Sequence, residues 1–238
     1  MLILAVDSST PVAGAALVDE CRVIAESFTN YKKTHSETLM PTINRILQEC
    51  ECGIQDIDIL AVTAGPGSFT GLRIGMAAVK GISMAARKPV VAVSTLDTLA
   101  GNIAGSNALV AALLDARKNE VYCAFYDAKG KMPERLQEPM ACTPETFLQT
   151  ALDLAEHTNK DRIILLGDGY YRYSDYFDRE LKDRLLPIPG HLMLPRAAAA
   201  GILAIDKARQ GKFADVFHLR PWYIRLSEAE YRLGKGEV

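Results

Sequence analysis

An apolar segment that ends at an aspartate and returns through a turn into a second apolar segment occurs twice in this chain. The first copy spans residues 2–6, with Asp7 at its end and the return at residues 12–18. The second spans residues 108–114, with Asp115 at its end and the return at residues 121–126. Short apolar runs separated by turn-forming residues predict β-hairpins. One such hairpin in each half of the chain predicts that a single βββαβα unit is duplicated.

The remaining periodic segments fit this unit. Thr34 and Glu37 have the spacing of a capping box at the start of a helix, and Ser68 can cap a second helix that ends before Pro89. The other predicted elements are strands at 22–28, 57–63, 90–93 and 163–166, and helices at 96–103 and 196–210.

Two such halves predict an α/β protein of the sugar kinase, Hsp70 and actin class (the ASKHA fold), built from two RNase H-like halves with mixed sheets. The expected domains are residues 1–104, and a smaller, degenerate half at 105–238. In this class the turn after the first strand of each half cradles phosphate, which makes Asp7, Ser9 and Asp115 phosphate-turn candidates. Kinases of the class follow this aspartate with Gly and Thr or Asn. Residues 8–10 and 116–118 lack that pattern, so the turns are interpreted as vestigial.

Composition and spacing exclude several kinds of chemistry. The formal net charge is −2, with 27 Lys and Arg against 29 Asp and Glu, which does not favour a basic nucleic-acid binder. No two of the four histidines have helical metal-ligand spacing, and Cys50 and Cys52 have no second pair. We therefore expect no catalytic residue, metal or cofactor, and reduced cysteines. The N-terminal apolar run lacks a basic flank and is too short for a signal peptide. With no apolar run long enough to span a membrane, this predicts a cytoplasmic protein.

A glycine-rich block, Gly65-Pro66-Gly67-Ser68-Phe69-Thr70-Gly71, leads into the second predicted helix. Glycine permits backbone conformations and close approaches that other residues do not. A helix that starts in such a turn offers free N–H groups to an anion, but the block matches neither the Walker nor the dinucleotide motif. Phosphate binding and tight strand-to-helix packing both remain open, with packing favoured.

The two N-terminal helices each have a face suited to packing. The first has a wide apolar stripe that includes an adaptable methionine, and the second carries small residues four apart that permit close helix approach. These faces pack either against this chain's own sheet or against a helix of a partner protein, and residue spacing does not distinguish the two alternatives. The partner-interface candidates are Leu39, Met40, Ile43, Leu47, Gly71, Leu72, Gly75, Met76 and Val79.

A basic and aromatic cluster lies near the C-terminus, with Trp222 and Tyr223 between Arg220 and Arg225. Such residues can stack on RNA bases and contact phosphates. Packing against the rest of the chain is the favoured interpretation.

Several segments together resemble the TsaB family, formerly YeaZ. They are residues 3–10, 35–41, 65–75 and 115–122, with 167–169 and 221–225 as later landmarks. The resemblance covers nearly the whole chain, and the 65–75 block is its most specific part. It implies the ASKHA fold and a role in making threonylcarbamoyladenosine beside certain tRNA anticodons.

The resemblance also implies a division of labour between subunits. Family members are paralogues of the catalytic subunit TsaD, whose metal is held by a His-x-x-x-His pair after the strand that follows the glycine block. The matching stretch here, residues 93–99, contains no histidine, as expected for a non-catalytic paralogue. Helices around 34–51 and 68–86 would bind TsaD, or a second copy of the chain when TsaD is absent. The ATPase TsaE would join through that pair, and tRNA would be contacted indirectly.

The alternative is an enzyme: a small ATP-dependent kinase of the same fold, similar to type III pantothenate kinases. The phosphate turns discriminate between the two hypotheses, because such kinases carry Gly and Thr or Asn after each strand-end aspartate.

Overall fold

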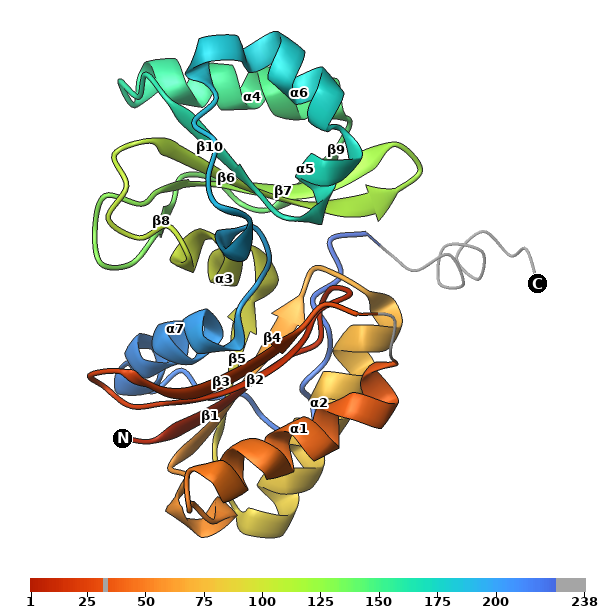
Figure 1. Cartoon of the computed structure of the whole chain (residues 1–238), viewed down its shortest axis with the longest axis vertical. Helices are drawn as coiled ribbons and strands as arrows, with labels where there is room; N and C mark the ends of the chain where they lie inside the picture. Colours follow the sequence, from red (N-terminus) through yellow and green to blue (C-terminus); the bar gives the residue numbers. More distant parts are fainter. Residues whose placement is uncertain (32–33, 226–238) are drawn as a thin grey trace, which may run out of the picture.

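The computed structural model describes residues 1–31 and 34–225. Two mixed β-sheets are stacked in this part of the chain, with α3 (Thr95–Gly101) and α7 (Ala197–Arg209) between them (Figure 1). The other long helices cover the outer faces. This layered arrangement confirms the predicted α/β class with two mixed-sheet halves.

The first sheet has the strand order β3-β2-β1-β4-β5. Strand β1 pairs antiparallel with β2 and parallel with β4, and β2 pairs antiparallel with β3. The three N-terminal strands therefore form an antiparallel meander that contains the predicted hairpin. Helices α1 and α2 cover its outer face, and a short 3₁₀ turn joins α1 to β4. The bounds are β1 Ile3–Asp7, β2 Ala13–Val18, β3 Val23–Thr29, α1 His35–Glu49, η1 Ile54–Asp56, β4 Ile59–Gly65, α2 Phe69–Ala86 and β5 Val90–Ser94.

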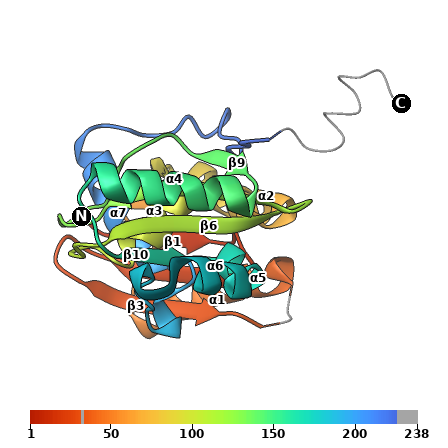
Figure 2. The ribbon, with the colours of Figure 1, turned by 90° about the horizontal axis from the view of Figure 1, so that it is seen from above.

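The second sheet repeats the pairing pattern of the first. Strand β6 pairs antiparallel with β7 and parallel with β10, as β1 does with β2 and β4, which supports the predicted duplication. Seen from above, α4 and α6 lie over this sheet (Figure 2). The bounds are β6 Leu109–Arg117, β7 Glu120–Asp127, β8 Glu134–Arg135, β9 Met140–Cys142, α4 Pro144–His157, β10 Ile163–Leu166, α5 Asp168–Arg172, α6 Ser174–Leu181, η2 Lys182–Arg184 and η3 Gly190–Leu192.

Helix α7 packs against the inner face of the first sheet and against α3, which in turn contacts β6. Its alanines pack against Ile3 and Ala5 on the inner face of the first sheet. A Cβ added at Gly201 would lie 2.7 Å from Val18 Cγ2, so the small residues of α7 set how closely it approaches the sheet. The predicted boundary between residues 104 and 105 stays a prediction. Helix α7, although it belongs to the 105–238 range, lies against the first sheet.

Alternation along β1 explains how one strand serves two layers. Successive strand side chains point to opposite faces. Leu4 and Val6 face the core under α1 and α2, while Ile3 and Ala5 face α7. All four are fully buried, because helices cover both faces of the sheet at this central strand.

Helix α1 begins after Thr34 as predicted, but the prediction of a capping box formed by Thr34 and Glu37 is wrong. Among the described residues, the Thr34 side chain makes no capping hydrogen bond. Its hydroxyl instead accepts from Ser36 Oγ at 3.4 Å, and the Glu37 N–H donates to the Thr34 carbonyl at 3.2 Å. The cap of α2 is confirmed, because Ser68 Oγ accepts from the Gly71 N–H at 3.2 Å.

No helix among the described residues has both the length and the apolar character needed to cross a membrane.

Candidate functional site

The glycine-rich block lies directly against the turn that follows β1. The Ser68 N–H donates to the Ser9 carbonyl at 2.7 Å, and Ser8 Oγ donates to the Gly71 carbonyl at 2.8 Å. A Cβ added at Gly67 would lie 2.1 Å from Ser9 O, and one at Gly71 would lie 2.1 Å from Ser8 O. Real Cβ atoms do not approach this closely, so both glycines are required by packing.

This geometry favours packing as the role of the block. The first N–H groups of a helix are its anion-binding groups. Here the Ser68 and Gly71 N–H groups already donate to Ser9 O and Ser68 Oγ. The block therefore fills the turn after β1 with the chain's own backbone.

Asp7 lies at the centre of this turn and is fully buried. Its Oδ1 accepts from the Ser9 N–H at 3.1 Å, from Ser9 Oγ at 2.6 Å and from Thr63 Oγ1 at 2.5 Å. Its Oδ2 is buried and has no hydrogen-bond partner among the described residues. Burial raises the pKa of Asp7 above its usual range, and the hydrogen bonds from Ser9 and Thr63 oppose that rise.

His35 belongs to the same cluster, although residue spacing did not single it out. Its Nε2 lies 2.9 Å from the Thr10 carbonyl oxygen, and its buried Nδ1 has no partner among the described residues. His35 is half-buried, because the start of α1 packs against the turn after β1. That proximity joins residues from separate elements, so local spacing could not reveal it.

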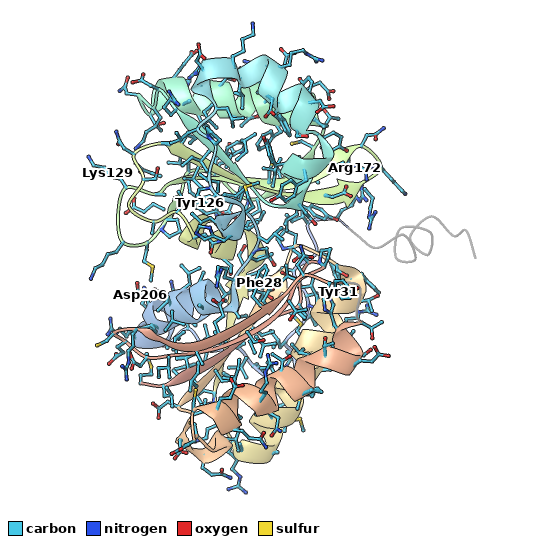
Figure 3. All side chains as sticks on the ribbon, in the orientation of Figure 1. Phe28, Tyr31, Tyr126, Lys129, Arg172 and Asp206 are labelled. Carbon is cyan, nitrogen blue, oxygen red and sulfur yellow. The ribbon has the colours of Figure 1, made fainter. Side chains whose placement is uncertain are left out.

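The equivalent turn in the second half is held by an arginine. Arg172 lies at the end of α5 (Figure 3). Its Nη1 is 3.1 Å from Asp115 Oδ2. Asp115 Oδ1 also accepts from the Arg117 N–H at 2.9 Å. The three residues 117–119 all have positive φ, and Arg117 pairs with Glu120 across a tight hairpin. The Asp115 carboxylate is therefore engaged by groups of its own half.

The Gly167-Asp168-Gly169 segment repeats the packing of the glycine block. A Cβ added at Gly167 would lie 2.0 Å from Leu113 O. Asp168 Oδ1 accepts from the Asp115 N–H at 3.1 Å, and burial raises the pKa of Asp168. In both halves, a glycine turn after a parallel strand closes on the strand-end aspartate.

The C-terminal basic and aromatic cluster packs within the chain. The Trp222 N–H donates to the Ala64 carbonyl at 2.7 Å, and Tyr223 stacks on Phe69 with ring centroids 5.5 Å apart. Arg225 forms an ion pair with Glu120 of the second half. These contacts fit the packing interpretation and link the two halves.

Helices α1 and α2 form a second candidate site, an apolar surface on the outside of the first sheet. Met40 is 48% exposed on α1. On α2, an exposed face consists of Ala77, Gly81, Met84 and Ala85. Between the helices lies a hollow of about 330 Å³, lined by Met40, Ile43, Asn44, Leu47, Ile54, Gln55, Ile82, Ala85 and Ala86. We call these exposed and lining residues the α1–α2 surface.

The nine interface candidates divide into two groups in this structure. Met40 is exposed and Leu47 half-buried. Seven are buried in this chain, where Gly71 and Gly75 face Ser8 and the others pack under the helices. These seven are Leu39, Ile43, Gly71, Leu72, Gly75, Met76 and Val79.

Known proteins share this fold and sequence over nearly the whole chain. The model of the family described as TsaD, tRNA N6-adenosine threonylcarbamoyltransferase, matches residues 22–212. The tRNA threonylcarbamoyladenosine biosynthesis protein TsaB of Bacillus subtilis is 33% identical, covering 97% of this chain and 96% of the relative. That of Escherichia coli is 30% identical, with 98% of each covered.

Solved structures agree with the sequence comparison. A structure described as YeaZ from Pseudomonas aeruginosa superposes with a TM-score of 0.73 at 26% identity, covering 93% of this chain and 99% of that chain. The activator of 2-hydroxyisocaproyl-CoA dehydratase from Clostridium difficile has a TM-score of 0.50 at 10% identity, covering 89% and 97%. The second likeness shows the fold alone.

The duplicated sheets and the paired aspartate turns define the class: this is an ASKHA-fold protein. Within that class, the chain belongs to the TsaB family of tRNA threonylcarbamoyladenosine biosynthesis proteins.

Gly71 and Gly81 provide a matched test of the packing argument, because both lie in α2. We expect Gly71→Ala to lower the free energy of unfolding by about 1–3 kcal/mol, because the new methyl group overlaps Ser8 O. Nothing lies within 4 Å of a Cβ at Gly81. We therefore expect Gly81→Ala to raise stability by about 0.5–1 kcal/mol through helix propensity. Urea unfolding measures both, and equal effects of the two changes would contradict the argument.

Asp7→Asn tests the buried carboxyl through pH. The unfolded-state pKa of aspartate is about 4, and burial raises the folded-state pKa. Between these two pKa values the folded state binds more protons than the unfolded state. The stability of the native chain therefore falls as pH rises from the unfolded-state pKa through the folded-state pKa. The variant lacks this loss, so its stability relative to the native chain should grow with pH and then level off. Parallel stability profiles from pH 4 upward would contradict a raised pKa.

Proposed function

We propose that this chain is a non-catalytic subunit that binds and stabilises TsaD for threonylcarbamoylation of the adenosine beside the anticodon of tRNA. Membership of the TsaB family supports a part in tRNA threonylcarbamoylation. The α1–α2 surface is the observation that supports binding to TsaD. TsaD would bind across this surface.

The composition of α2 supports a covered surface. Among its 18 residues, Arg73 and Lys80 are the charged ones. A helix with so few charged residues is normally buried over most of its surface, yet beyond Arg73 this helix exposes Ala77, Gly81 and Ala85, spaced four apart. Small residues at that spacing let a second helix approach closely. A partner helix would bury this face.

The buried candidates have a supporting part in the proposal. Leu39, Ile43 and Met76 belong to the core beneath the two helices and hold the surface in shape. The contact itself would come from Met40, Leu47 and the exposed residues of α2. Charge at Ile43 or Met76 would disrupt the core, so the test uses exposed positions.

The non-catalytic part of the proposal rests on how both phosphate turns are filled. The glycine block occupies the turn after β1 through Ser9 and Gly71. Arg172 binds the Asp115 carboxylate in the second half. A kinase of this fold needs these turns for nucleotide phosphates, so the arrangement favours a partner role over the kinase alternative.

The remaining partners follow from the family resemblance. We propose that TsaE joins the pair formed with TsaD, that the chain self-associates through the same surface when TsaD is absent, and that tRNA is contacted through TsaD. The site of action would be the cytoplasm.

Charge on the α1–α2 surface should prevent TsaD binding without unfolding the chain. We expect Met40→Glu and Ala85→Glu each to weaken TsaD affinity at least about tenfold, because a desolvated charge opposes burial. Titration calorimetry with purified TsaD measures the affinity, and circular dichroism confirms folding.

Tyr171→Glu is the matched control, since Tyr171 is an apolar ring that is 53% exposed on α5 of the other half. It should bind TsaD with native affinity. Native affinity of both folded surface variants would rule out this surface as the binding site.

The kinase alternative has a separate test. We expect titration of the isolated chain with Mg-ATP to give no binding in the micromolar range, because its own groups occupy both phosphate turns. Micromolar binding that Arg172→Ala or Asp7→Ala alters would favour the kinase alternative.

A further inference from the structure

Two cysteines of the second sheet face each other across neighbouring strands. Cys123 lies in β7 and Cys142 in β9, with their Sγ atoms 3.6 Å apart. In the antiparallel register, Cys123 pairs with Met140 and Val121 pairs with Cys142, so the cysteines are diagonal neighbours. Both are free thiols. Neither has a part in the proposed partner surface or the aspartate turns.

The two thiols differ in exposure. Cys123 is fully buried in the core under α4. Cys142 is half-buried on β9, a three-residue strand that pairs with β7 beside the main strand path of the sheet (Figure 1). A small oxidant in solvent therefore reaches Cys142 before Cys123.

The hydrogen bond between the sulfurs also distinguishes them chemically. Either sulfur can donate in this contact. The hydrogen bond with Cys123 holds the pKa of Cys142 below its usual value, against the opposing effects of burial and of Glu120. Glu120 is itself paired with Arg225, which moderates its charge. The same bond and burial raise the pKa of Cys123. Since the thiolate is the reactive form, Cys142 is the more reactive of the two.

We propose that Cys123 and Cys142 form a redox-active dithiol that peroxide converts to an intramolecular disulfide. The Cys142 thiolate attacks one oxygen of hydrogen peroxide, the O–O bond breaks, and a sulfenic acid forms while hydroxide leaves and takes up a proton as water. The Cys123 sulfur then attacks the Cys142 sulfur. The S–O bond breaks, and the Cys123 proton leaves with the hydroxyl group as a second water. Two thiols are oxidised and one peroxide is reduced.

The position of β9 allows this bond to form. A disulfide needs sulfurs about 2.05 Å apart, so the strands must draw together from the reduced geometry. β9 is short, and its neighbour Thr143 caps α4. The chain segment from Cys123 to Cys142 includes Arg135, which donates to Asp97 Oδ1 of α3 at 2.6 Å. The disulfide would thus close a loop that contacts the layer between the sheets.

The experiment uses the full chain with Cys21, Cys50 and Cys52 changed to serine, so that Cys123 and Cys142 are the remaining thiols. After treatment with hydrogen peroxide, we expect the intact mass to fall by about 2 Da through loss of two hydrogens. Both thiols should disappear together, and a non-reducing peptide map should join the two cysteine peptides. Dithiothreitol should restore the mass. A mass gain from oxygen at Cys142 with no disulfide, or two retained thiols, would overturn the proposal.

Single variants in the same background assign the order of attack. Cys123→Ala should leave Cys142 as a sulfenic acid that dimedone traps, and Cys142→Ser should leave Cys123 unreactive under the same treatment. Circular dichroism checks folding, and the Cys142→Ser variant decides the order if the buried Cys123→Ala change unfolds the chain. Faster oxidation of Cys123 than of Cys142 would overturn the assignment of Cys142 as the attacking thiol.

Discussion

The contact between the glycine block and the turn after β1 is the constraint on which the first half depends. Gly67 and Gly71 lie so close to the Ser8 and Ser9 carbonyls that no side chain fits between them. This contact fixes where α2 starts and how it crosses the sheet. It also encloses Asp7, whose carboxyl is left with one bonded oxygen and one unpaired oxygen. The same feature therefore sets both the helix position and the unusual environment of the aspartate.

The two halves share one backbone arrangement, in which a glycine turn packs near an aspartate, but different side chains surround that aspartate. In each, a glycine turn after a parallel strand packs against backbone close to the aspartate. The contact is at Ser9, two residues after Asp7, in one half and at Leu113, two residues before Asp115, in the other. The first aspartate is buried among hydroxyl groups, whereas Asp115 is held by Arg172. The two halves thus share this backbone packing and differ in the side chains at the two equivalent turns.

Helix α2 is constrained on both of its sides. Its inner glycines accommodate the turn after β1, while Ala77, Gly81 and Ala85 leave the outer face smooth and apolar. Because an apolar face gains free energy when it leaves water, this helix suits a second layer of structure outside the chain. The proposed TsaD contact and the internal packing therefore depend on opposite faces of one element.

The sequence by itself determined most strands, the helices α1, α2, α3 and α7, and the repeated hairpin, because period-two and helical patterns are local. It also determined the capping role of Ser68 at the start of α2. It did not mark α4, α6 or the short strands β8 and β9. Tertiary structure decided which faces were exposed: Ile43 and Met76 share helices with Met40 and Ala85, yet their burial depends on where the sheet lies. It also decided the proximity of His35 to Thr10, of Arg172 to Asp115, and of Cys123 to Cys142. Each of these contacts joins separate elements, and no local spacing encodes the distance between them.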